Sequence, residues 1–361
     1  MNNENKEVLL KVDHLEQFFK LGKRTLKAVN DVNFEIYKGE VFGLVGESGC
    51  GKTTTGRTII GLNEISGGSV YYKGERIAAG TLSYKEAIAK AKADHKSGKI
   101  TDEELTNCVK ENSDKIAAAK ADNKKWRRTN KSNQLLSEIQ MIFQDPIASL
   151  DPRMTVRDII AEGLIIRGEK DQAKIDRQVF DMLEIVGLVP EHATRYPHEF
   201  SGGQRQRIGI ARAIIMKPEL IIADEPISAL DVSIQAQVIN LLNELSEKMG
   251  LTILFIAHDL AVVKYFSNRI AVMYFGKIVE LATSDELFKH SFHPYTKALL
   301  SAIPLPDPIT EKSRKRMTYN PMLDHDYSIE GPTMREIYPG HFVYCNEEEM
   351  KKYKAEWEAT K

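Results

Sequence analysis

The sequence predicts an α/β fold in which helices cover both faces of a mainly parallel sheet. Glu40–Val45 has the compact apolar pattern of a buried strand, ends at a glycine-rich turn and precedes a helical stretch at Thr54–Leu62. Further short apolar runs alternate with helical stretches along the rest of the chain. Strands joined by helices of this length form parallel sheets that are buried on both faces.

The individual elements follow from hydrophobic periodicity and from turn residues. Strands are expected at Val8–Val12, Val32–Ile36, Gln140–Phe143, Leu220–Ala223, Thr252–Ala257 and Arg269–Tyr274. A hairpin is expected from Gly68–Tyr72 and Glu75–Ile77. Helices are expected at Thr155–Ile166, Asp171–Val186 and Ile208–Met216. Prolines at 304, 306 and 308 indicate a linker, and a polar segment with further prolines at Tyr319–Pro339 follows.

The stretch Thr81–Lys131 differs in composition from its surroundings. It is rich in Ala, Lys, Asp and Glu, and its apolar positions are sparse. Ser97 and Gly98 break the helical pattern, and Thr101 and Glu104 have the spacing of a capping box. We therefore expect a pair of solvated helices, inserted at about 80–131. Lys and Arg outnumber Asp and Glu there, so contact with anionic lipid or a partner is the alternative; the mixed charges favour a solvated arm.

Composition limits the classes of function. The 361 residues are 42% hydrophobic and 28% charged, which is ordinary for a globular protein with a core, and the net charge is −1. Without a basic field, we expect no nucleic-acid partner. Three cysteines provide neither a disulfide framework nor the ligands of an iron–sulfur cluster. The polar N-terminus is not a signal peptide, and no apolar run is long enough to span a bilayer.

A phosphate-binding loop is the first chemical motif. Residues 46–53 match G-x-x-x-x-G-K-[ST] between a strand and a helix, where backbone N–H groups cradle phosphates. Lys52 is expected to neutralise phosphate oxygens and Thr53 to offer a hydroxyl to Mg²⁺. A chance glycine loop is the less favoured alternative, and Cys50 is expected to fill space in the loop. The expected nucleotide-binding residues of this loop are Gly46, Glu47, Ser48, Gly49, Cys50, Gly51, Lys52, Thr53 and Thr54.

An acidic pair follows the apolar strand at Leu220–Ala223. Asp224 is expected in the Mg²⁺ shell, and Glu225 is expected to polarise the attacking water. Such a pair is weak evidence alone, but it follows a phosphate loop by about one domain length. The two motifs together predict a nucleoside triphosphatase.

The segment Phe200–Gln204 decides the family. Ser201, Gly202 and Gly203 open a helix and form a second anion-binding helix end, whereas a plain helix cap is the alternative. Together with Gln204 they resemble the signature of the ATP-binding cassette family. In that family two subunits dimerise head to tail, and each signature closes over the ATP held by the other subunit.

The resemblance assigns further residues. Gln144 matches the glutamine that contacts Mg²⁺ and water, and His258 matches the histidine that senses the γ-phosphate; a structural histidine is the alternative. The dimer-interface loop is matched by Ser228, Ala229, Leu230 and Asp231. Phe19 resembles the aromatic residue that stacks on adenine, with Phe18 as its rival and a core position as the alternative. The implied catalytic residues are Lys52, Gln144, Glu225 and His258, and the implied Mg²⁺ ligands are Thr53, Gln144 and Asp224.

Within this family the chain resembles the F-type ATP-binding subunits of bacterial oligopeptide importers. The residues that carry the resemblance are Met141–Pro146, Ala148–Arg153, Arg195–Phe200 and His293–Leu300. The resemblance implies a nucleotide-binding domain at 1–290, with a helical signature subdomain at about 145–215, and a C-terminal extension at 291–361. It also implies ATP and Mg²⁺ as cofactors, and a peripheral position on the cytoplasmic side of the cell membrane. The implied partners are a second ATPase subunit, two membrane permeases and, indirectly, an extracellular peptide-binding protein.

Two departures and several alternatives accompany this assignment. Relatives usually have a shorter link in place of 81–131, and Cys345 alone cannot hold the iron–sulfur centre of some members of this branch. The alternative cargo is dipeptide, nickel or glutathione in place of longer peptides. A soluble cassette ATPase of translation or DNA repair is disfavoured, because the chain has one set of motifs and no long coiled coil. A non-catalytic regulatory subunit is disfavoured by the complete hydrolytic set.

Overall fold

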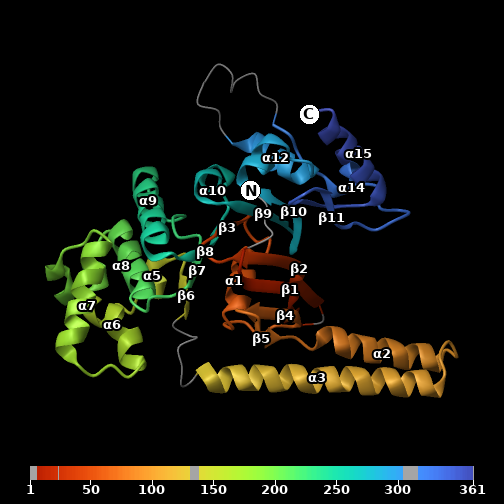
Figure 1. Ribbon diagram of the computed structural model, residues 1–361, viewed down its shortest axis with the longest axis horizontal. Coiled ribbons are helices and arrows are strands. Elements are labelled where there is room, and N and C mark those ends of the chain that lie inside the picture. The colour runs from red at the N-terminus through yellow and green to blue at the C-terminus, as the bar shows by residue number, and fades with distance from the viewer. Residues whose placement is uncertain (1–5, 23, 131–137, 304–315, 361) are drawn as a thin grey trace. The chain divides into compact units, whose positions relative to one another are not determined.

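The computed structural model describes residues 6–22, 24–130, 138–303 and 316–360 (Figure 1). The chain divides into two units that interleave along the sequence. The first contains Met1–Lys38, Thr53–Leu136 and Phe275–Lys277. The second contains Gly39–Lys52, Ser137–Tyr274 and Ile278–Lys361.

The first unit is built on an antiparallel sheet in the order β2-β1-β4-β5. Its strands are β1 (Val8–Leu21), β2 (Arg24–Tyr37), β4 (Gly67–Tyr72) and β5 (Glu75–Ala79). Val12 on β1 pairs with Phe34 on β2 and with Val70 on β4, and all three side chains are buried. The strands β1 and β2 are longer than predicted, because bulges after Val12 interrupt the alternation that marks a strand in sequence. Helix α1 (Lys52–Ile59) follows the phosphate loop.

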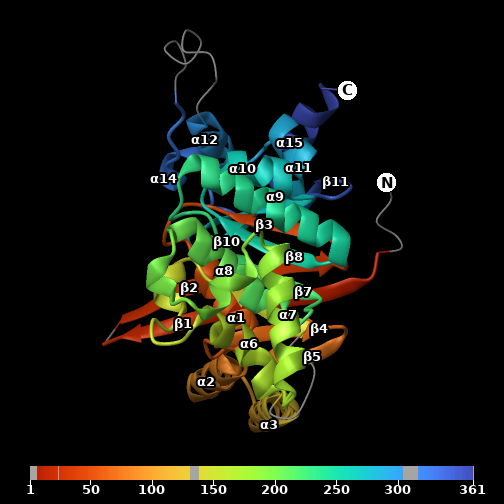
Figure 2. The same ribbon diagram turned by 90° about the vertical axis from the view of Figure 1, so that its left-hand side faces the viewer.

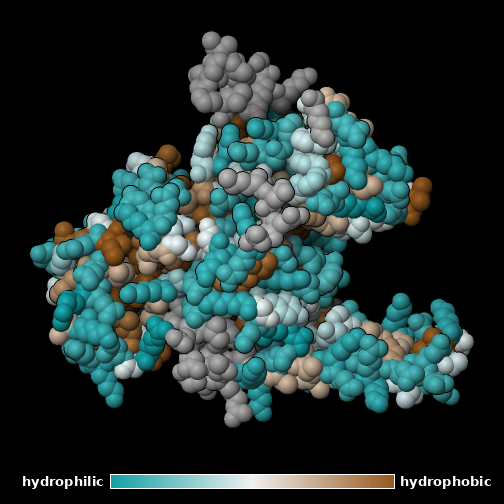
Figure 3. Space-filling view, viewed as in Figure 1, coloured by the Kyte–Doolittle hydropathy of each residue, from teal (hydrophilic) through white to brown (hydrophobic). Residues whose placement is uncertain are grey.

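The predicted helix pair is present as α2 (Leu82–Lys96) and α3 (Asp102–Asn130), which lie side by side (Figure 1). Thr101 and Glu104 form the expected capping box at the start of α3. Asn123 on α3 exchanges two hydrogen bonds of 2.8 Å with the backbone of Ala79 on β5, which ties the pair to the sheet. The surface of the helix pair that is visible in Figure 3 is mostly hydrophilic, as expected of a solvated arm. Whether 80–131 is an insertion remains a prediction.

The second unit contains an eight-stranded sheet in the order β11-β12-β10-β9-β3-β8-β7-β6. Its strands are β3 (Val41–Val45), β6 (Ile139–Ile142), β7 (Leu220–Asp224), β8 (Thr252–Ala257), β9 (Arg269–Tyr274), β10 (Lys277–Thr283), β11 (Thr333–Tyr338) and β12 (His341–Cys345). The strand β3 pairs in parallel with β8 and β9, and β7 pairs in parallel with β8 and β6. Every residue of β3, β7 and β8 is buried, which confirms the predicted parallel sheet with two covered faces.

Four helices form a group beside this sheet, at the left of Figure 1 and toward the viewer in Figure 2. They are α5 (Pro146–Ser149), α6 (Val156–Ile166), α7 (Gln172–Ile185) and α8 (Gly202–Ile214). Thr155 and Asp171 cap α6 and α7, and the buried side chains Ile160, Val179 and Ile208 belong to the main core. Two 3₁₀ turns, Pro190–Thr194 and Pro197–Glu199, lead into α8. The limits of a helical subdomain at 145–215 remain a prediction.

The C-terminal region joins the same sheet. The second unit also contains two helices before this region, α9 (Val232–Met249) and α10 (Leu260–Phe266). Within the region the structure describes α11 (Ser284–Lys289), α12 (Pro294–Ala302), α14 (Pro321–Asp324) and α15 (Glu347–Glu358). Strand β12 pairs antiparallel with β10, where Val343 faces Glu280. The sequence predicted no strand after residue 303, because the polar surroundings hide the short apolar positions of β11 and β12. The predicted linker prolines lie outside the described residues, and a domain boundary at 290 remains a prediction.

The start of α12 has an expected pH dependence. His293 is buried, and its Nδ1 accepts a hydrogen bond of 3.1 Å from Tyr295 N–H, which caps the helix. Burial, with a smaller effect of the nearby His325, lowers the pKa of His293 to about 3. Because the unfolded chain takes up this proton near pH 6.5, it binds more protons than the folded chain between these values. The free energy of unfolding therefore falls as the pH drops below about 6.5.

We expect His293→Asn to remove this dependence, because asparagine also caps helices and does not titrate. From pH 7.5 to pH 5, the wild type is expected to lose about 2 kcal/mol more than the variant in its free energy of unfolding, measured by urea denaturation. An equal loss in both proteins would contradict the assignment.

Candidate active site

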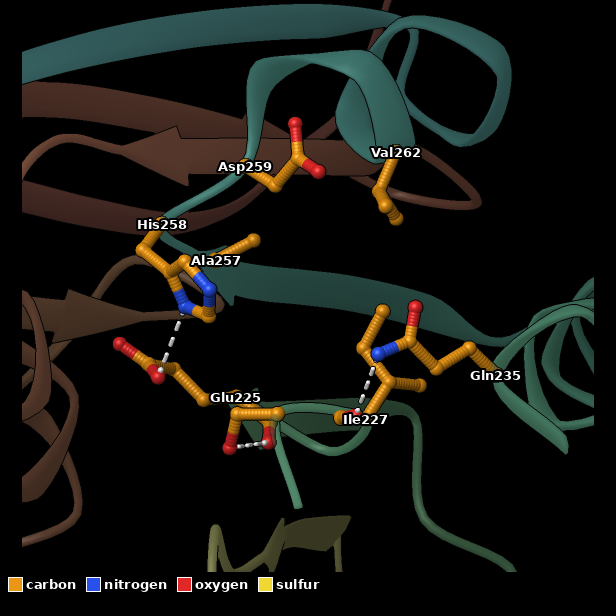
Figure 4. Close-up of a pocket in the computed structure, with 8 residues that line it drawn as sticks. Glu225, Ile227, Gln235, Ala257, His258, Asp259 and Val262 are labelled. Atoms are coloured by element: carbon orange, nitrogen blue, oxygen red, sulfur yellow. Dashed lines mark hydrogen bonds and ion pairs between the residues drawn. The ribbon is translucent and has the colours of Figure 1, made fainter. Parts of the chain in front are cut away.

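Three predicted catalytic residues follow three neighbouring parallel strands. Glu225 is preceded by Asp224, the last residue of β7; His258 follows β8, and Gln144 lies just after β6. Because the carboxyl ends of parallel strands share one edge of a sheet, these side chains converge there. The Glu225 Oε2 atom accepts hydrogen bonds from Gln144 Nε2 at 3.2 Å and from His258 Nδ1 at 3.1 Å (Figure 4 shows the latter).

The backbone of Glu225 is held in an unusual conformation. Its φ is +44°, a left-handed value that costs energy for a residue with a side chain. Its N–H donates to Ile256 O at 3.0 Å, and its carbonyl accepts from the N–H and the hydroxyl of Ser228. These bonds hold the backbone of the strained residue, and those from Gln144 and His258 hold its carboxylate. The side chain is therefore oriented before any ligand binds.

The phosphate loop has the backbone that its glycines require. Gly49 and Gly51 have φ values of +81° and +110°, which a side chain would strain. At Gly46 an added Cβ would lie 2.1 Å from Met273 O, so only glycine fits. Cys50 is buried, and burial raises the pKa of its thiol, in line with a space-filling role. Thr53 and Thr54 follow in the first turn of α1.

The Lys52 ammonium is buried beside this loop and near the catalytic carboxylate. The side chain is 3% exposed, and its Nζ donates to Gly46 O at 2.7 Å and to Glu47 O at 2.9 Å. Its Nζ also lies 3.8 Å from Glu225 Oε1. A cation buried at this point needs anionic or carbonyl partners, so a phosphate chain entering the loop finds a positive charge already in place.

The expected Mg²⁺ ligands have the right chemistry. Asp224 is fully buried at the end of β7, next to Glu225, and Gln144 presents an amide oxygen from the neighbouring strand end. Carboxylate, amide and hydroxyl oxygens are ligands that Mg²⁺ prefers. Asp224 and Gln144 therefore fit the ion chemically, whereas the roles of both residues and of Thr53 as ligands remain predictions.

The signature residues cap α8. Ser201 Oγ accepts from Gln204 N–H at 3.4 Å, and Gln204 Oε1 accepts from Ser201 N–H at 3.0 Å, so they form a capping box. Ser201 and Gly202 are exposed. Gly203 has a separate reason to be glycine, because an added Cβ would lie 2.5 Å from Ile234 on α9. Both sequence interpretations fit, since a capped helix start still presents backbone N–H groups to an anion.

The loop at Ser228–Asp231 is held by a residue that the sequence analysis missed. Gln235 Nε2 donates to Ile227 O at 3.2 Å and to Leu230 O at 3.0 Å. Gln235 and His258 line opposite sides of one pocket (Figure 4). A glutamine in a helix has no distinctive spacing, so no signal in the sequence marks it. Ala229 and Asp231 are exposed, as an interface loop requires.

The adenine-stacking residue remains a prediction. Phe19 on β1 pairs with Leu26 on β2 and is half-buried. The ring of Phe18, its rival, lies 5.1 Å from Lys27 Nζ in a cation–π contact.

The comparisons with known proteins agree with this geometry. The family model for ABC transporters matches residues 29–103 and 95–228, and the model for the oligopeptide/dipeptide transporter C-terminal region matches residues 279–327. The oligopeptide transport ATP-binding protein OppF of Bacillus subtilis is 52% identical, over 96% of this chain and 99% of its own length. The chain belongs to the ABC transporter family. It is an ABC ATPase with an oligopeptide/dipeptide transporter C-terminal region.

Other relatives extend the comparison. The oligopeptide transport protein AmiF of Streptococcus pneumoniae is 47% identical over 96% of this chain and 98% of its own length. The dipeptide transport protein DppF of Lactococcus lactis is 47% identical over 96% of both chains. Among solved structures, the ATP-binding cassette MJ0796 bound to ADP and Pi has a TM-score of 0.56 at 24% identity, over 76% of this chain and 99% of its own. This last likeness shows that the ABC fold is shared.

Proposed function

We propose that this chain hydrolyses ATP with Mg²⁺ to power oligopeptide import, as a peripheral subunit on the cytoplasmic side of the cell membrane. The observation that carries the proposal is the convergence on the Glu225 carboxylate of Gln144, His258 and the buried Lys52. A carboxylate placed beside the phosphate-binding lysine is suited to accept a proton from an attacking water. The names of the OppF and AmiF relatives support the cargo.

The residues suggest how turnover proceeds. Lys52 is bound by loop carbonyls and lies close to Glu225, so the phosphates of ATP compete with these groups for its ammonium. When Lys52 turns to the phosphates, Glu225 keeps its hydrogen bonds to Gln144 and His258 and is free to take the proton of water. Mg²⁺ would neutralise charge that develops on the phosphate oxygens.

We further propose a head-to-tail pairing with a second ATPase subunit, beneath two membrane permeases. Ser201 and Gly202 are exposed at the start of α8 and offer a second phosphate-binding surface. This surface is separate in sequence from the phosphate loop at 46–53, so a nucleotide held by another subunit is its expected ligand. Among the residues that the structure describes, no helix is both long and apolar enough to cross a membrane. A peptide-binding protein outside the cell would contact the permeases and reach this chain only through them.

Transport measurements in reconstituted vesicles test the function. The assembly containing this chain is expected to take up radiolabelled oligopeptide when ATP is supplied on the side that carries the ATPase subunits. Dipeptide is the alternative cargo, since the DppF relative is nearly as similar, and unlabelled dipeptide that fully displaces the signal would favour it. ATP-independent uptake, or ATP hydrolysis unaffected by either peptide, would contradict the proposal.

A further inference from the structure

One side chain of the C-terminal region reaches the phosphate loop. Tyr295 lies in the first turn of α12, and its hydroxyl accepts a hydrogen bond of 3.1 Å from Glu47 N–H. Tyr295 is 2% exposed. Burial raises the pKa of Tyr295 above its usual value, so the hydroxyl stays neutral and does not repel phosphate. The contact joins two segments that are almost 250 residues apart, within the second unit.

The peptide group that Tyr295 holds also contacts the catalytic lysine. That group joins Gly46 to Glu47, and Gly46 O accepts from Lys52 Nζ at 2.7 Å. In the next peptide group, Glu47 O accepts from Lys52 Nζ at 2.9 Å and from Cys50 N–H at 3.3 Å. Glu47, Ser48 and Gly49 are the exposed part of the loop. The Tyr295 hydroxyl therefore holds the backbone N–H of Glu47, the first residue of the exposed segment Glu47–Gly49.

Tyr295 is itself tightly oriented. Its N–H is bound by His293, and the carboxylate of buried Glu280 accepts from Phe292 N–H at 2.8 Å and His293 N–H at 3.1 Å. The centroid of the Tyr295 ring lies 4.4 Å from that of Tyr274 on β9 and 5.5 Å from that of Tyr319. Ring contacts and burial restrict the rotamers of this side chain, so its hydroxyl is a fixed anchor for the loop.

We propose that Tyr295 is a positioning residue for ATP binding, through which the C-terminal region holds the phosphate loop in its phosphate-binding conformation. The inference rests on the proposed function, because it takes ATP as the ligand of this loop. Without the hydroxyl, Glu47 N–H loses its partner and ATP must order the loop as it binds. That ordering reduces affinity and leaves the chemical step at Glu225 intact.

The test is Tyr295→Phe in the full-length chain, which removes one oxygen and retains the ring. We expect the dissociation constant for ATP and the KM to rise about 2- to 10-fold, the equivalent of one neutral hydrogen bond, while kcat is unchanged. We also expect hydrogen exchange at the Glu47 amide, measured without nucleotide, to become about tenfold faster.

Tyr319→Phe is the matched control. It removes a hydroxyl from the same aromatic cluster, one that is bound to His325 Nε2 at 3.0 Å and does not touch the loop. We expect ATP affinity and Glu47 exchange to stay at the wild-type values. Equal weakening by both variants would overturn the inference in favour of general support of the fold.

The inference and the proposed function fail differently. A wild type that hydrolyses ATP, with a Tyr295→Phe variant of equal affinity and equal Glu47 exchange, overturns the inference alone. A wild type that does not hydrolyse ATP overturns the proposed function, whereas amide exchange still reports on the hydrogen bond. An unprotected Glu47 amide in the wild type overturns the inference without any variant.

Discussion

Glu225→Gln is expected to abolish ATP turnover while leaving ATP binding intact. Glutamine has nearly the same shape and retains an oxygen for the bonds from Gln144 and His258, but it cannot accept a proton from water. Loss of a positioned general base lowers kcat by about 10²- to 10⁴-fold. Phosphate release by the complete assembly measures the loss, and a fluorescent ATP analogue measures binding.

Glu244→Gln is the control for this substitution. Glu244 is an exposed carboxylate on α9, paired with Lys248 at 3.1 Å, and lies outside the site. Its variant is expected to turn over ATP at the wild-type rate. Undiminished turnover in Glu225→Gln would remove Glu225 from the mechanism.

Lys52→Ala is expected to abolish ATP binding itself. The substitution deletes the buried ammonium and with it the hydrogen bonds that Nζ donates to the carbonyls of Gly46 and Glu47. Hydrogen bonds to a charged group contribute about 1.5–3 kcal/mol each, so the dissociation constant for ATP is expected to rise at least about 100-fold. Isothermal titration with ATP measures the change.

The comparison variant is Lys248→Ala, which removes an exposed lysine that is paired within one helix. ATP affinity should be unaffected, because a solvated pair of this kind contributes little. If Lys52→Ala bound ATP as tightly as Lys248→Ala, the loop at 46–53 would not be the phosphate site. The contrast with Glu225→Gln separates binding from chemistry.

Local sequence signals predicted the parallel sheet and most of the residues that the structure brings together at the candidate site. Apolar runs mark β3, β7 and β8 because those strands are buried on both faces, and a parallel sheet brings the residues after them to one edge. The positions of Glu225 and His258 follow from that topology. The glycines of the phosphate loop have conformations that other residues rarely adopt, so their spacing is informative.

Long-range contacts between ordinary residues could not be predicted. Gln235 acts through two hydrogen bonds to the backbone carbonyls of Ile227 and Leu230, which nothing in the sequence marks. Tyr295 acts through one hydrogen bond from Glu47 N–H, which is remote in sequence. Gly203 reads as part of an anion site, and only the approach of Ile234 reveals its packing role. Strand β12 was missed because its pairing with β10 depends on burial that the C-terminal composition does not show.

A structure of the ATP-loaded assembly, trapped by Glu225→Gln, tests the central claim most directly. The account predicts that Ser201 and Gly202 of this chain lie within about 3 Å of the γ-phosphate bound to the second ATPase subunit. It also predicts that Lys52 contacts the phosphates held by this chain's own loop. A trapped assembly in which Ser201 faces solvent, away from any bound nucleotide, would contradict it.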